Sequence, residues 1–484
     1  MKSITAIHDL INIIPDYLPF SPNADQKTAI EKISAFIFNP DERAVFILRG
    51  YAGTGKTNLI SAFTRALPGI KWRSVLLAPT GRAAKVLSAY SQRPAQTIHK
   101  KIFRKQMGPS GSVIFSLGEN LHRNTLFIVD EASMISADSG GESLFNSLLE
   151  NLFEYVYSGD NCKLILIGDT AQLPPVGSDE SPALNKKYLQ AAFHLNIDLF
   201  ELKEVARQRL ESGILLNATN LRQSMEQGKS GFPRITCTAD VINLKGDELE
   251  ETLNASISNF GEDNTIIITR SNKRANLFNQ SFRNRIKLYE EDLSGGDKIM
   301  IVKNNYFWLP DNNGEAGFIA NGDIAEISKI MNRETIYGFN FCECLIKFSD
   351  YPNLPEQQVK IITDCLFTDS PSLSTEEQKR LYEAVLDDVR DEPNKGLRLA
   401  YLKKSPYYNA LQVKFSYAIT CHKSQGGQWP VVFIDQGYLK EENVNEGFLR
   451  WLYTALTRAT EKVYLINFNA QFFDPEQRLS TEHF

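Results

Sequence analysis

The sequence predicts an α/β protein that contains two parallel β-sheets covered by helices. Short runs rich in Val, Ile and Leu recur along the chain, and most are bounded by Gly, Pro, Asp or Ser. These runs are continuous rather than alternating, which is typical of parallel strands buried on both faces. Helical patterns such as residues 56–67 and 82–90 separate the runs. The alternation of the two patterns favours a doubly wound architecture.

The apolar runs fall into two groups, so we expect one sheet in each half of the chain. Between residues 304 and 411, turn signals flank short β-rich runs, and a charged helical stretch covers 374–391. We therefore expect a small β-rich insertion within the second α/β domain. The apolar runs are 44–48, 75–78, 126–129 and 164–167 in the first group, and 265–269, 431–434 and 462–466 in the second.

The composition is that of a globular protein that needs neither disulfides nor a metal ion to fold. The 484 residues are 42% hydrophobic and 23% charged, and a chain of this length buries a large share of its surface. No apolar run approaches the roughly 18–20 residues of a membrane span. The cysteines are scattered, which predicts free thiols in a reducing compartment and therefore a cytoplasmic protein, associated with the nucleoid if it is bacterial. They are Cys162, Cys237, Cys342, Cys344, Cys365 and Cys421.

Charge is distributed unevenly along the chain. The net charge of −5 by itself argues against a nucleic-acid-binding protein. However, residues 43–118 contain 13 Lys and Arg but no Asp or Glu, and residues 393–434 contain 6 Lys and Arg and again no acid. The remaining 366 residues carry a net charge of −24. Acid-free stretches of this kind suit a groove that follows a phosphate backbone.

Residues 50–57 match the phosphate-loop pattern G-x-x-x-x-G-K-[ST], directly after a predicted strand and before a predicted helix. Backbone N–H groups of such a loop wrap phosphates, and the helix N-terminus adds the positive end of its dipole. Lys56 is expected to reach the β- and γ-phosphates, and the Thr57 hydroxyl is expected to ligate Mg²⁺. The pattern therefore predicts a nucleotide site. Its loop residues are Gly50, Ala52, Gly53, Thr54, Gly55, Lys56 and Thr57.

Polar side chains follow two further predicted strands. The run 126–129 ends in Asp130 and Glu131. The Asp is placed to hold Mg²⁺ through water, and the Glu to orient and deprotonate an attacking water. After the run 164–167, the amide of Gln172 is placed to sense a γ-phosphate. The alternatives are an exposed acidic strand end and a polar loop without a role.

Together with these sites, a series of ordered motifs resembles the superfamily 1B DNA helicases, the RecD-like and phage Dda-like group. The resemblance covers nearly the whole chain. Because a short segment precedes the first motif, it is to the minimal, Dda-like form. The motifs are the Q motif at 23–29, motif Ia at 78–84, motif Ib at 97–99, motif III at 168–175, motif IV at 204–208, motif V at 417–426 and motif VI at 453–459.

The resemblance implies roles for individual residues. Gln26 would contact adenine, and Arg207 and Arg458 would reach the γ-phosphate from the second domain. Gln425 and Gly426 of motif V would also lie at the nucleotide. For each arginine taken alone, a surface salt bridge is the alternative. The residues implied in DNA binding are Pro79, Thr80, Gly81, Arg82, Thr97, His99, Thr420, His422, Lys423 and Ser424.

Several of these and other side chains are open to two interpretations. Tyr306, Phe307 and Trp308 are able to stack on bases, but an aromatic cluster in a β-rich module is also typical of a core. His99 and His422 either contact the strand or make structural hydrogen bonds.

The resemblance also implies the architecture, with two RecA-like P-loop motor domains. A short accessory insertion interrupts the first, and residues 108–111 would turn a hairpin that matches the strand-separating pin of the relatives. The β-rich insertion of the second would be an SH3-like module. The boundaries are 1–195 for the first motor domain with its insertion at about 97–122, 196–303 and 412–484 for the second motor domain, and 304–411 for the SH3-like insertion.

The function that the resemblance implies is that of an ATP-dependent DNA helicase. Such an enzyme hydrolyses ATP with Mg²⁺, moves 5′→3′ on single-stranded DNA and unwinds forked duplex DNA, and we expect this chain to act as a monomer. One alternative is an RNA helicase of the same superfamily, because a groove that follows the backbone discriminates poorly between the sugars. The other is a DNA-dependent ATPase that binds or remodels DNA without unwinding it.

Overall fold

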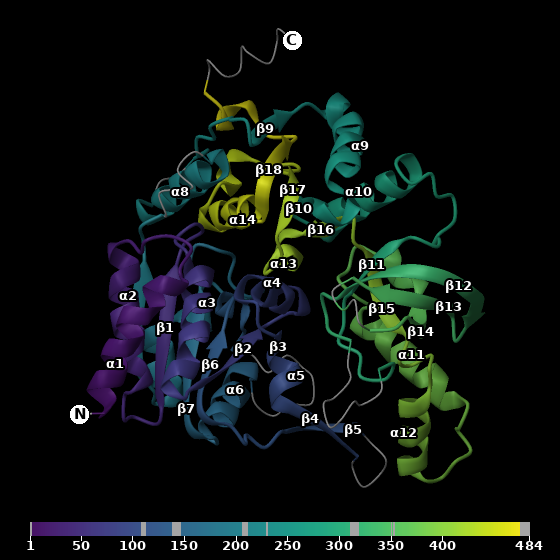
Figure 1. Cartoon of the computed structure of the whole chain (residues 1–484). Helices are drawn as coiled ribbons and strands as arrows, with labels where there is room; N and C mark the ends of the chain where they lie inside the picture. Colours follow the sequence, from purple (N-terminus) through teal and green to yellow (C-terminus); the bar gives the residue numbers. More distant parts are fainter. Residues whose placement is uncertain are drawn as a thin grey trace.

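The computed structural model describes residues 2–107, 113–137, 147–205, 212–228, 231–309, 319–349, 351 and 354–474. Its strands form two parallel sheets, a closed barrel and a two-stranded hairpin. Figure 1 shows the first sheet and its helices in purple and blue, the second sheet above them, and the barrel to the right. The predicted fold class, two helix-covered parallel sheets with a hairpin insertion and a β-rich insertion, is confirmed.

The first sheet is parallel throughout, with strand order β3-β2-β6-β7-β1-β8. Its central strands are buried on both faces, which explains their continuous apolar runs. In β1 (Ala44–Gly50), Phe46 and Leu48 face one hydrophobic core, and Val45 and Ile47 face another. The other strands are β2 (Arg73–Ala78), β3 (Ala95–Thr97), β6 (Arg123–Val129), β7 (Asp160–Gly168) and β8 (Asn196–Leu202).

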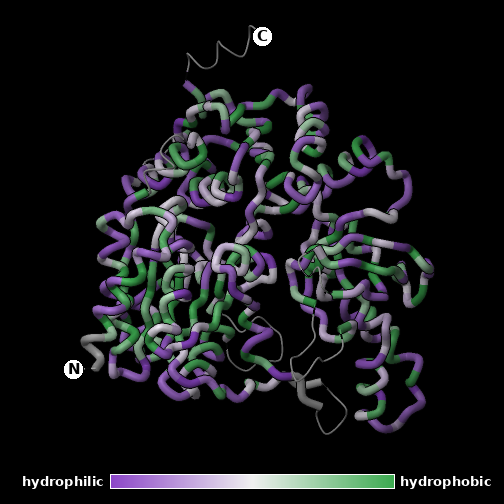
Figure 2. The backbone as a smooth tube through the Cα atoms, viewed as in Figure 1, coloured by the Kyte–Doolittle hydropathy of each residue, from purple (hydrophilic) through white to green (hydrophobic). Residues whose placement is uncertain are grey.

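Helices cover both faces of this sheet. Figure 2 shows hydrophobic stretches running through its strands, with hydrophilic segments on the outer turns. The helices are α1 (Lys2–Ile13), α2 (Ala24–Ile37), α3 (Lys56–Ala66), α4 (Gly81–Ser91), α5 (Ile98–Ile102), α6 (Leu148–Tyr157) and α7 (Lys186–Phe193). The inserted hairpin pairs β4 (Phe103–Met107) with β5 (Val113–Leu117). Its predicted turn at 108–111 lies outside the described residues.

The predicted boundary between residues 195 and 196 is wrong. Strand β8 pairs in parallel with β1, from Ala44 opposite Asn196 to Gly50 opposite Leu202. It therefore belongs to the first sheet. This strand lies at the sheet edge, where exposed and buried residues mix, so it lacks the continuous apolar run by which the other strands were recognised.

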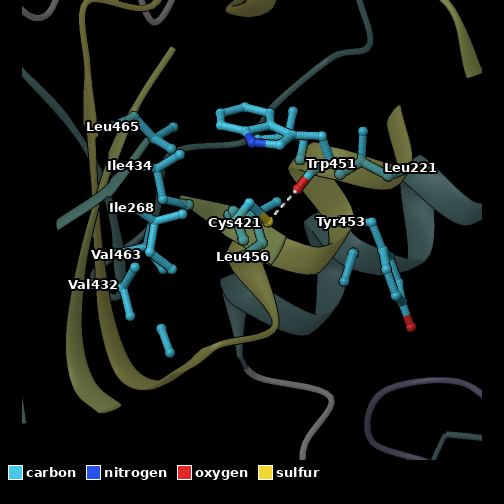
Figure 3. Packing of buried hydrophobic residues seen from close by; sticks show 14 of the residues in the cluster. Leu221, Ile268, Cys421, Val432, Ile434, Trp451, Tyr453, Leu456, Val463 and Leu465 are labelled. Atoms are coloured by element: carbon cyan, nitrogen blue, oxygen red, sulfur yellow. Dashed lines mark hydrogen bonds between the residues drawn. The ribbon is translucent and has the colours of Figure 1, made fainter. Parts of the chain in front are cut away.

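The second sheet is also parallel, with strand order β16-β10-β17-β18-β9. Figure 3 shows side chains from three of these strands packed against Leu221, Trp451 and Leu456 of the covering helices. The strands are β9 (Val241–Leu244), β10 (Thr265–Thr269), β16 (Ala418–Thr420), β17 (Trp429–Asp435) and β18 (Ala459–Ile466). The helices are α8 (Gly213–Glu226), α9 (Leu249–Phe260), α10 (Asn272–Arg285), α13 (Cys421–Ser424) and α14 (Glu446–Leu456). Within the described part of the chain, no helix has the length and apolar character to cross a membrane.

The barrel includes more of the chain than the predicted insertion at 304–411, because its strands extend from Lys298 to Phe415. It closes because its first and last strands pair antiparallel with each other, Ile299 opposite Phe415. The whole of the first strand and all of the last except Leu411 fall in segments that the sequence assigned to the second motor domain. The helices α11 (Thr375–Asp387) and α12 (Lys395–Lys404) lie between the last two strands of the barrel in sequence and pack on a core that includes Phe339 and Phe341. The barrel strands are β11 (Lys298–Ile301), β12 (Ile324–Ile336), β13 (Phe339–Phe348), β14 (Gln357–Ile362) and β15 (Leu411–Phe415).

A buried ion pair joins the barrel to the second motor domain. Arg283 of α10 donates two hydrogen bonds to the Asp297 carboxylate, at 2.9 and 3.0 Å. The Tyr417 hydroxyl donates a third, at 3.0 Å, and its ring stacks on Phe282. Asp297 has no exposed surface and precedes β11, whereas Tyr417 precedes β16. The network therefore fixes both chain crossings between the two units.

We predict that Asp297→Ala lowers the free energy of unfolding by about 3–5 kcal/mol, because it leaves the Arg283 guanidinium buried without its counter-charge. Urea unfolding followed by circular dichroism measures this change. Glu250→Ala is the matched control, because it removes an exposed carboxylate that lies 3.5 Å from Arg285, which is on α10 like Arg283. This change should lower the free energy of unfolding by less than about 1 kcal/mol. Equal losses in the two variants would contradict the role of the network.

Candidate active site between the two motor domains

The phosphate loop connects β1 to α3 at the carboxyl edge of the first sheet. Gly53 and Gly55 have φ angles of 79° and 84°, in the left-handed region that favours glycine. The Lys56 ammonium donates to the carbonyl oxygens of Gly50, at 2.5 Å, and Tyr51, at 3.0 Å. The lysine therefore lies folded over its own loop, where phosphate oxygens would replace the carbonyl groups as partners.

The Gln26 side chain supports the phosphate loop through a hydrogen bond to its backbone. Its side chain is 1% exposed, and its Nε2 donates to the carbonyl oxygen of Thr54 at 3.0 Å. Its Oε1 accepts from the Asn23 N–H in a capping box at the start of α2. A Cβ atom at Gly55 would lie 2.7 Å from the Gln26 amide. The predicted contact of Gln26 with adenine stays a prediction.

Two buried carboxyl groups, those of Asp130 and Asp169, interact with Lys56. Asp130 accepts a hydrogen bond from the Glu131 N–H at 2.9 Å. Burial, and then the charge of Glu131, raise the pKa of Asp130 to about 6, while Lys56 opposes the shift. Burial also raises the pKa of Asp169, which Lys56 again lowers. Lys56 is thus the cation that lowers the pKa of both Asp130 and Asp169.

The residues present fit a magnesium nucleotide. Among the described residues, no group of three His, Cys, Asp or Glu side chains is arranged to hold a metal ion. Mg²⁺ usually takes one or two protein oxygens and completes its shell with substrate phosphates and water. Thr57, in the first turn of α3, and Asp130 offer the oxygen ligands that such a shared site requires.

Arg458 reaches this corner from the second motor domain. Its guanidinium is nearly buried, with Nη1 3.8 Å from Oε1 of Glu131. Hydrogen bonds to the carbonyl oxygens of Thr454 and Gly427, at 3.1 and 3.3 Å, hold it in place. Glu131 has a φ angle of 53°, an uncommon conformation for a non-glycine residue. The structure therefore brings together two of the predicted catalytic residues.

Gln172 lies in the loop after β7 and is 6% exposed. Its Oε1 is buried and makes no hydrogen bond within the described part of the chain. A buried acceptor without a partner is rare in native proteins and points to a missing ligand or water. Two hydrogen bonds hold this loop against the second motor domain. Gln425 donates to the Leu173 carbonyl at 2.6 Å, and the Leu173 N–H donates to the Thr454 hydroxyl at 2.9 Å.

Sequence reasoning missed Tyr453. Its hydroxyl accepts from the N–H of Ala52 in the phosphate loop at 2.8 Å and donates to Asp169 at 2.6 Å. Figure 3 shows this hydroxyl pointing away from the hydrophobic cluster that holds the ring. Burial, and then the Asp169 charge, raise the pKa of Tyr453 well above its usual value. Its place in motif VI was visible in the sequence, but its partners lie more than 280 residues away.

Some of the predicted strand contacts lie where the two motor domains meet. Thr80 caps α4 by accepting from Ala83 N–H at 3.2 Å, and the Arg82 guanidinium lies 4.2 Å from the centre of the Trp429 ring. A Cβ atom at Gly426 would lie 2.6 Å from that of Ala83. The segments that carry motifs Ia and V are therefore in direct contact.

The barrel also contacts this region. The Lys423 ammonium donates to Asn321 at 2.5 Å, and Lys85 donates to the carbonyl oxygen of Ser349 at 3.1 Å. A Cβ atom at Gly81 would lie 2.5 Å from the Asp323 carboxylate. Helix α4, which includes part of motif Ia, and motif V thus meet two segments of the barrel unit, the turn before β12 and the residues after β13, which form one wall of the predicted groove.

One predicted DNA contact, Ser424, is wrong. For two others, Thr97 and His99, burial changes what the side chain is able to contribute. Ser424 has no exposed surface and its hydroxyl donates to the Cys421 carbonyl, so it cannot reach a strand in this arrangement. Thr97 is 5% exposed and caps α5 through the Lys100 N–H. Burial lowers the pKa of His99 to about 4, so this imidazole is neutral at pH 7.

The remaining predicted residues vary in exposure. His422 is exposed, and burial of part of its ring lowers its pKa. Pro79 and Thr420 are half-buried. Arg207 lies outside the described residues.

Comparisons with known proteins agree with this geometry. Residues 21–233 match the AAA domain family, and residues 415–466 match the UvrD-like helicase C-terminal domain family. The chain is 28% identical to the ATP-dependent DNA helicase Dda of Enterobacteria phage T4 over 265 residues, which cover 52% of this chain and 55% of that protein. It is 34% identical to the ATP-dependent RecD2 DNA helicase of Deinococcus radiodurans over 130 residues, 27% of this chain and 16% of that protein.

Among solved structures, the fold is similar to that of the Pif1 helicase from Bacteroides in complex with ADP-AlF3 and ssDNA. The TM-score is 0.45 at 15% identity, with 96% of each chain covered. The two curated relatives are matched over about half and about a sixth of their lengths. The chain thus carries a match to the AAA domain family in its first half and a match to the UvrD-like helicase C-terminal domain family near its end, and it is similar in sequence to two DNA helicases.

We predict that Tyr453→Phe lowers the rate of ATP hydrolysis by at least about tenfold. The change removes hydrogen bonds to a charged group and to the loop backbone, which contribute about 1.5–3 kcal/mol and 0.5–1.5 kcal/mol respectively. A steady-state assay at saturating ATP measures it. Tyr464→Phe is the control, because that ring stacks on Phe433 without entering the site. Unchanged hydrolysis in Tyr453→Phe would show that the hydroxyl does not position the loop.

Proposed function

We propose that this protein is an ATP-dependent DNA helicase that moves 5′→3′ along single-stranded DNA and unwinds forked duplex DNA, with Mg²⁺ bound beside the nucleotide. The observation that carries the proposal is the contact of Arg458 with Glu131 across the gap between the motor domains. An arginine from one domain beside the catalytic carboxylate of the other is the arrangement that makes hydrolysis depend on domain closure. The names of the relatives support DNA as the substrate.

The Arg458–Glu131 pair explains how hydrolysis is gated. Arg458 lies near the carboxylate that is expected to orient water. A bound triphosphate supplies a stronger anion at this corner, and Arg458 is expected to turn to it. Glu131 is then released to act as the base. Once the γ-phosphate has left, Arg458 returns to Glu131, so the two domains alternate between two sets of contacts.

The loop after β7 connects this corner to the strand groove. The carbonyl oxygen of Thr170 accepts from Arg450 of α14 at 2.7 Å. The carbonyl oxygen of Leu173 accepts from Gln425, which directly follows α13. Because α13 also carries Lys423, a shift of the loop is passed to a predicted DNA contact through one short helix. Grip on the strand is thereby expected to change with the state of the nucleotide site.

Strand separation is assigned to the accessory hairpin. Its strands β4 and β5 project from the first motor domain, as Figure 1 shows. The proposed 5′→3′ direction follows the resemblance to the superfamily 1B group. One chain supplies both Glu131 and Arg458, which supports action as a monomer. The six cysteines are free, which supports a reducing compartment such as the cytoplasm.

Forked DNA with a single tail tests both activity and direction. We expect strand displacement with ATP on a fork that has only a 5′ tail and none on a fork that has only a 3′ tail. Lys56→Ala is expected to abolish displacement and hydrolysis but to keep strand binding, because it removes the phosphate cation alone. Displacement from the 3′ tail alone would overturn the direction.

Two further results would replace the proposal. DNA-stimulated hydrolysis without displacement on either fork would make the protein a remodelling ATPase. Matched single-stranded DNA and RNA oligonucleotides separate the substrates, and stronger stimulation of hydrolysis by RNA would make it an RNA helicase.

The affinity for single-stranded DNA is predicted to depend on pH through Lys423. Burial lowers the pKa of Lys423 to about 8, so the ammonium is charged below that pH and loses its proton above it. Affinity for single-stranded DNA should therefore fall about two- to fivefold between pH 7 and pH 9, the value of one screened charge contact of roughly 0.5–1 kcal/mol. Fluorescence anisotropy at constant ionic strength measures it. Lys423→Arg should remove this dependence, and an identical fall in the arginine variant would exclude Lys423 as its origin.

A further inference from the structure

A cavity of about 320 Å³ lies between the barrel and the helices α11 and α12. It is outside the nucleotide site, and its walls come from the segment after β11, from both helices and from the segment that leads into β15. Figure 1 shows α11 and α12 projecting from the barrel away from the second sheet. The volume falls within the range of about 300–1,000 Å³ that is typical of ligand pockets.

The lining combines three kinds of side chain. Tyr306, Phe307 and Tyr408 offer aromatic rings, and Lys303 and Lys403 offer cations. Most of the other lining residues are Asn and Gln, and among the described residues that line the cavity there is no Asp or Glu. This is unexpected, because the adjoining helix α11 is rich in acidic residues. Rings, amides and cations without carboxylates are the groups that contact the base and phosphate of an unpaired nucleotide.

The walls are held in place before any ligand arrives. The Trp308 indole and the Asn305 amide both donate to the Asn409 carbonyl, at 2.8 and 2.7 Å. Lys303 donates to Gln378 of α11 at 3.0 Å, so it joins the barrel side to the helix side. Trp308 packs against the barrel core, which confirms the core interpretation for this ring, whereas Tyr408 is 38% exposed.

Two hydrogen bonds connect the cavity to the predicted strand groove. Lys423, a predicted DNA contact, donates to the side chain of Asn321 at 2.5 Å. The N–H of Asn321 in turn donates to the side chain of Asn304 at 2.8 Å, and Asn304 lines the cavity. A strand that contacts Lys423 therefore has the cavity within reach of its neighbouring nucleotides.

We propose that this cavity is a subsite for one unpaired nucleotide of the strand along which the protein moves. The base lies against Tyr408 and the neighbouring rings, and the adjoining phosphate lies between Lys303 and Lys403. The inference rests on the proposed function, since it presumes a strand in the groove. It extends the strand path beyond the two motor domains onto the inserted helices and makes α11 and α12 part of the DNA-binding surface.

The test compares Tyr408→Ala with Tyr401→Ala in the full chain. Tyr401 lies on α12, is 42% exposed and does not line the cavity. Affinity for single-stranded DNA oligonucleotides of increasing length is measured by fluorescence anisotropy without nucleotide. We expect Tyr408→Ala to weaken binding of the long oligonucleotides about tenfold, as for one stacked base, and Tyr401→Ala to change it less than twofold. Oligonucleotides too short to reach the cavity should bind both variants like the original chain.

A second pair of variants tests the phosphate contact. Lys403→Ala should reduce the slope of log affinity against log salt by about 0.7, the value for one phosphate of a single strand. Lys404→Ala, an exposed lysine at the next position that does not line the cavity, should leave the slope unchanged. Equal slopes for the two variants would remove Lys403 from the strand path and overturn the phosphate assignment.

The base contact has its own readout. The adenine analogue 2-aminopurine is placed at successive positions of the long oligonucleotide, and stacking in the cavity should quench it at one position. Tyr408→Ala should remove this quenching, and Tyr408→Phe should keep both the quenching and the affinity, which distinguishes loss of the ring from misfolding. Unchanged quenching in Tyr408→Ala would overturn the proposal. The proposal would also be overturned if the cavity bound free dAMP but was not occupied by the oligonucleotide.

The results separate this inference from the proposed function. If the original chain binds and unwinds DNA but Tyr408→Ala and Tyr401→Ala behave alike, the helicase assignment stands and the subsite is wrong. If the original chain binds no single-stranded DNA, the proposed function fails and the subsite fails with it.

Discussion

Closure of the second motor domain onto the phosphate loop is the constraint on which the rest of the site depends. Tyr453 bonds the loop backbone at Ala52 and the carboxyl of Asp169 with a single hydroxyl. Five residues later in the chain, Arg458 reaches Glu131. Because both side chains extend from α14 and its C-terminal turn, the position of one helix sets the hydrogen bonding of the loop and the environment of the Glu131 carboxylate together.

The same closure arranges the predicted strand groove. Gly426 has room for no side chain beside Ala83, and Arg82 lies over Trp429, so the segments that carry motifs Ia and V meet at the same interface as the nucleotide site. An opening of a few ångströms at the nucleotide would separate these pairs as well. The two regions are therefore connected by direct packing, with the loop at Leu173 as the shared element.

Charge shapes the surface on which a strand would lie. The two acid-free stretches, residues 43–118 and 393–434, contain the phosphate loop, motifs Ia, Ib and V, and also Lys403 beside the cavity. A net charge of −24 is carried by the rest of the chain. The negative remainder disfavours nucleic acid elsewhere on the surface. The overall charge of −5 thus hides two basic stretches of sequence in an otherwise acidic chain.

The features that depend on local chemistry were recognisable in the sequence alone. The phosphate loop at 50–57, the strand ends with Asp130 and Glu131, and the two groups of buried strands are all recognisable because each needs particular residue types at fixed spacing. The order of the motifs then indicated two motor domains and an SH3-like insertion, and the sheets and the barrel agree with it.

Only the tertiary structure decided the features that depend on pairing over long distances. β8 was placed in the wrong domain because an edge strand has a mixed pattern, and the barrel limits moved because closure depends on β11 meeting β15. Burial excluded Ser424 from the groove, although its neighbour Lys423 is partly exposed. Tyr453 gained its role from partners hundreds of residues away. Residue type and spacing specify what a segment is able to do, but which segments meet is decided by packing of the whole chain, which no single stretch of sequence contains.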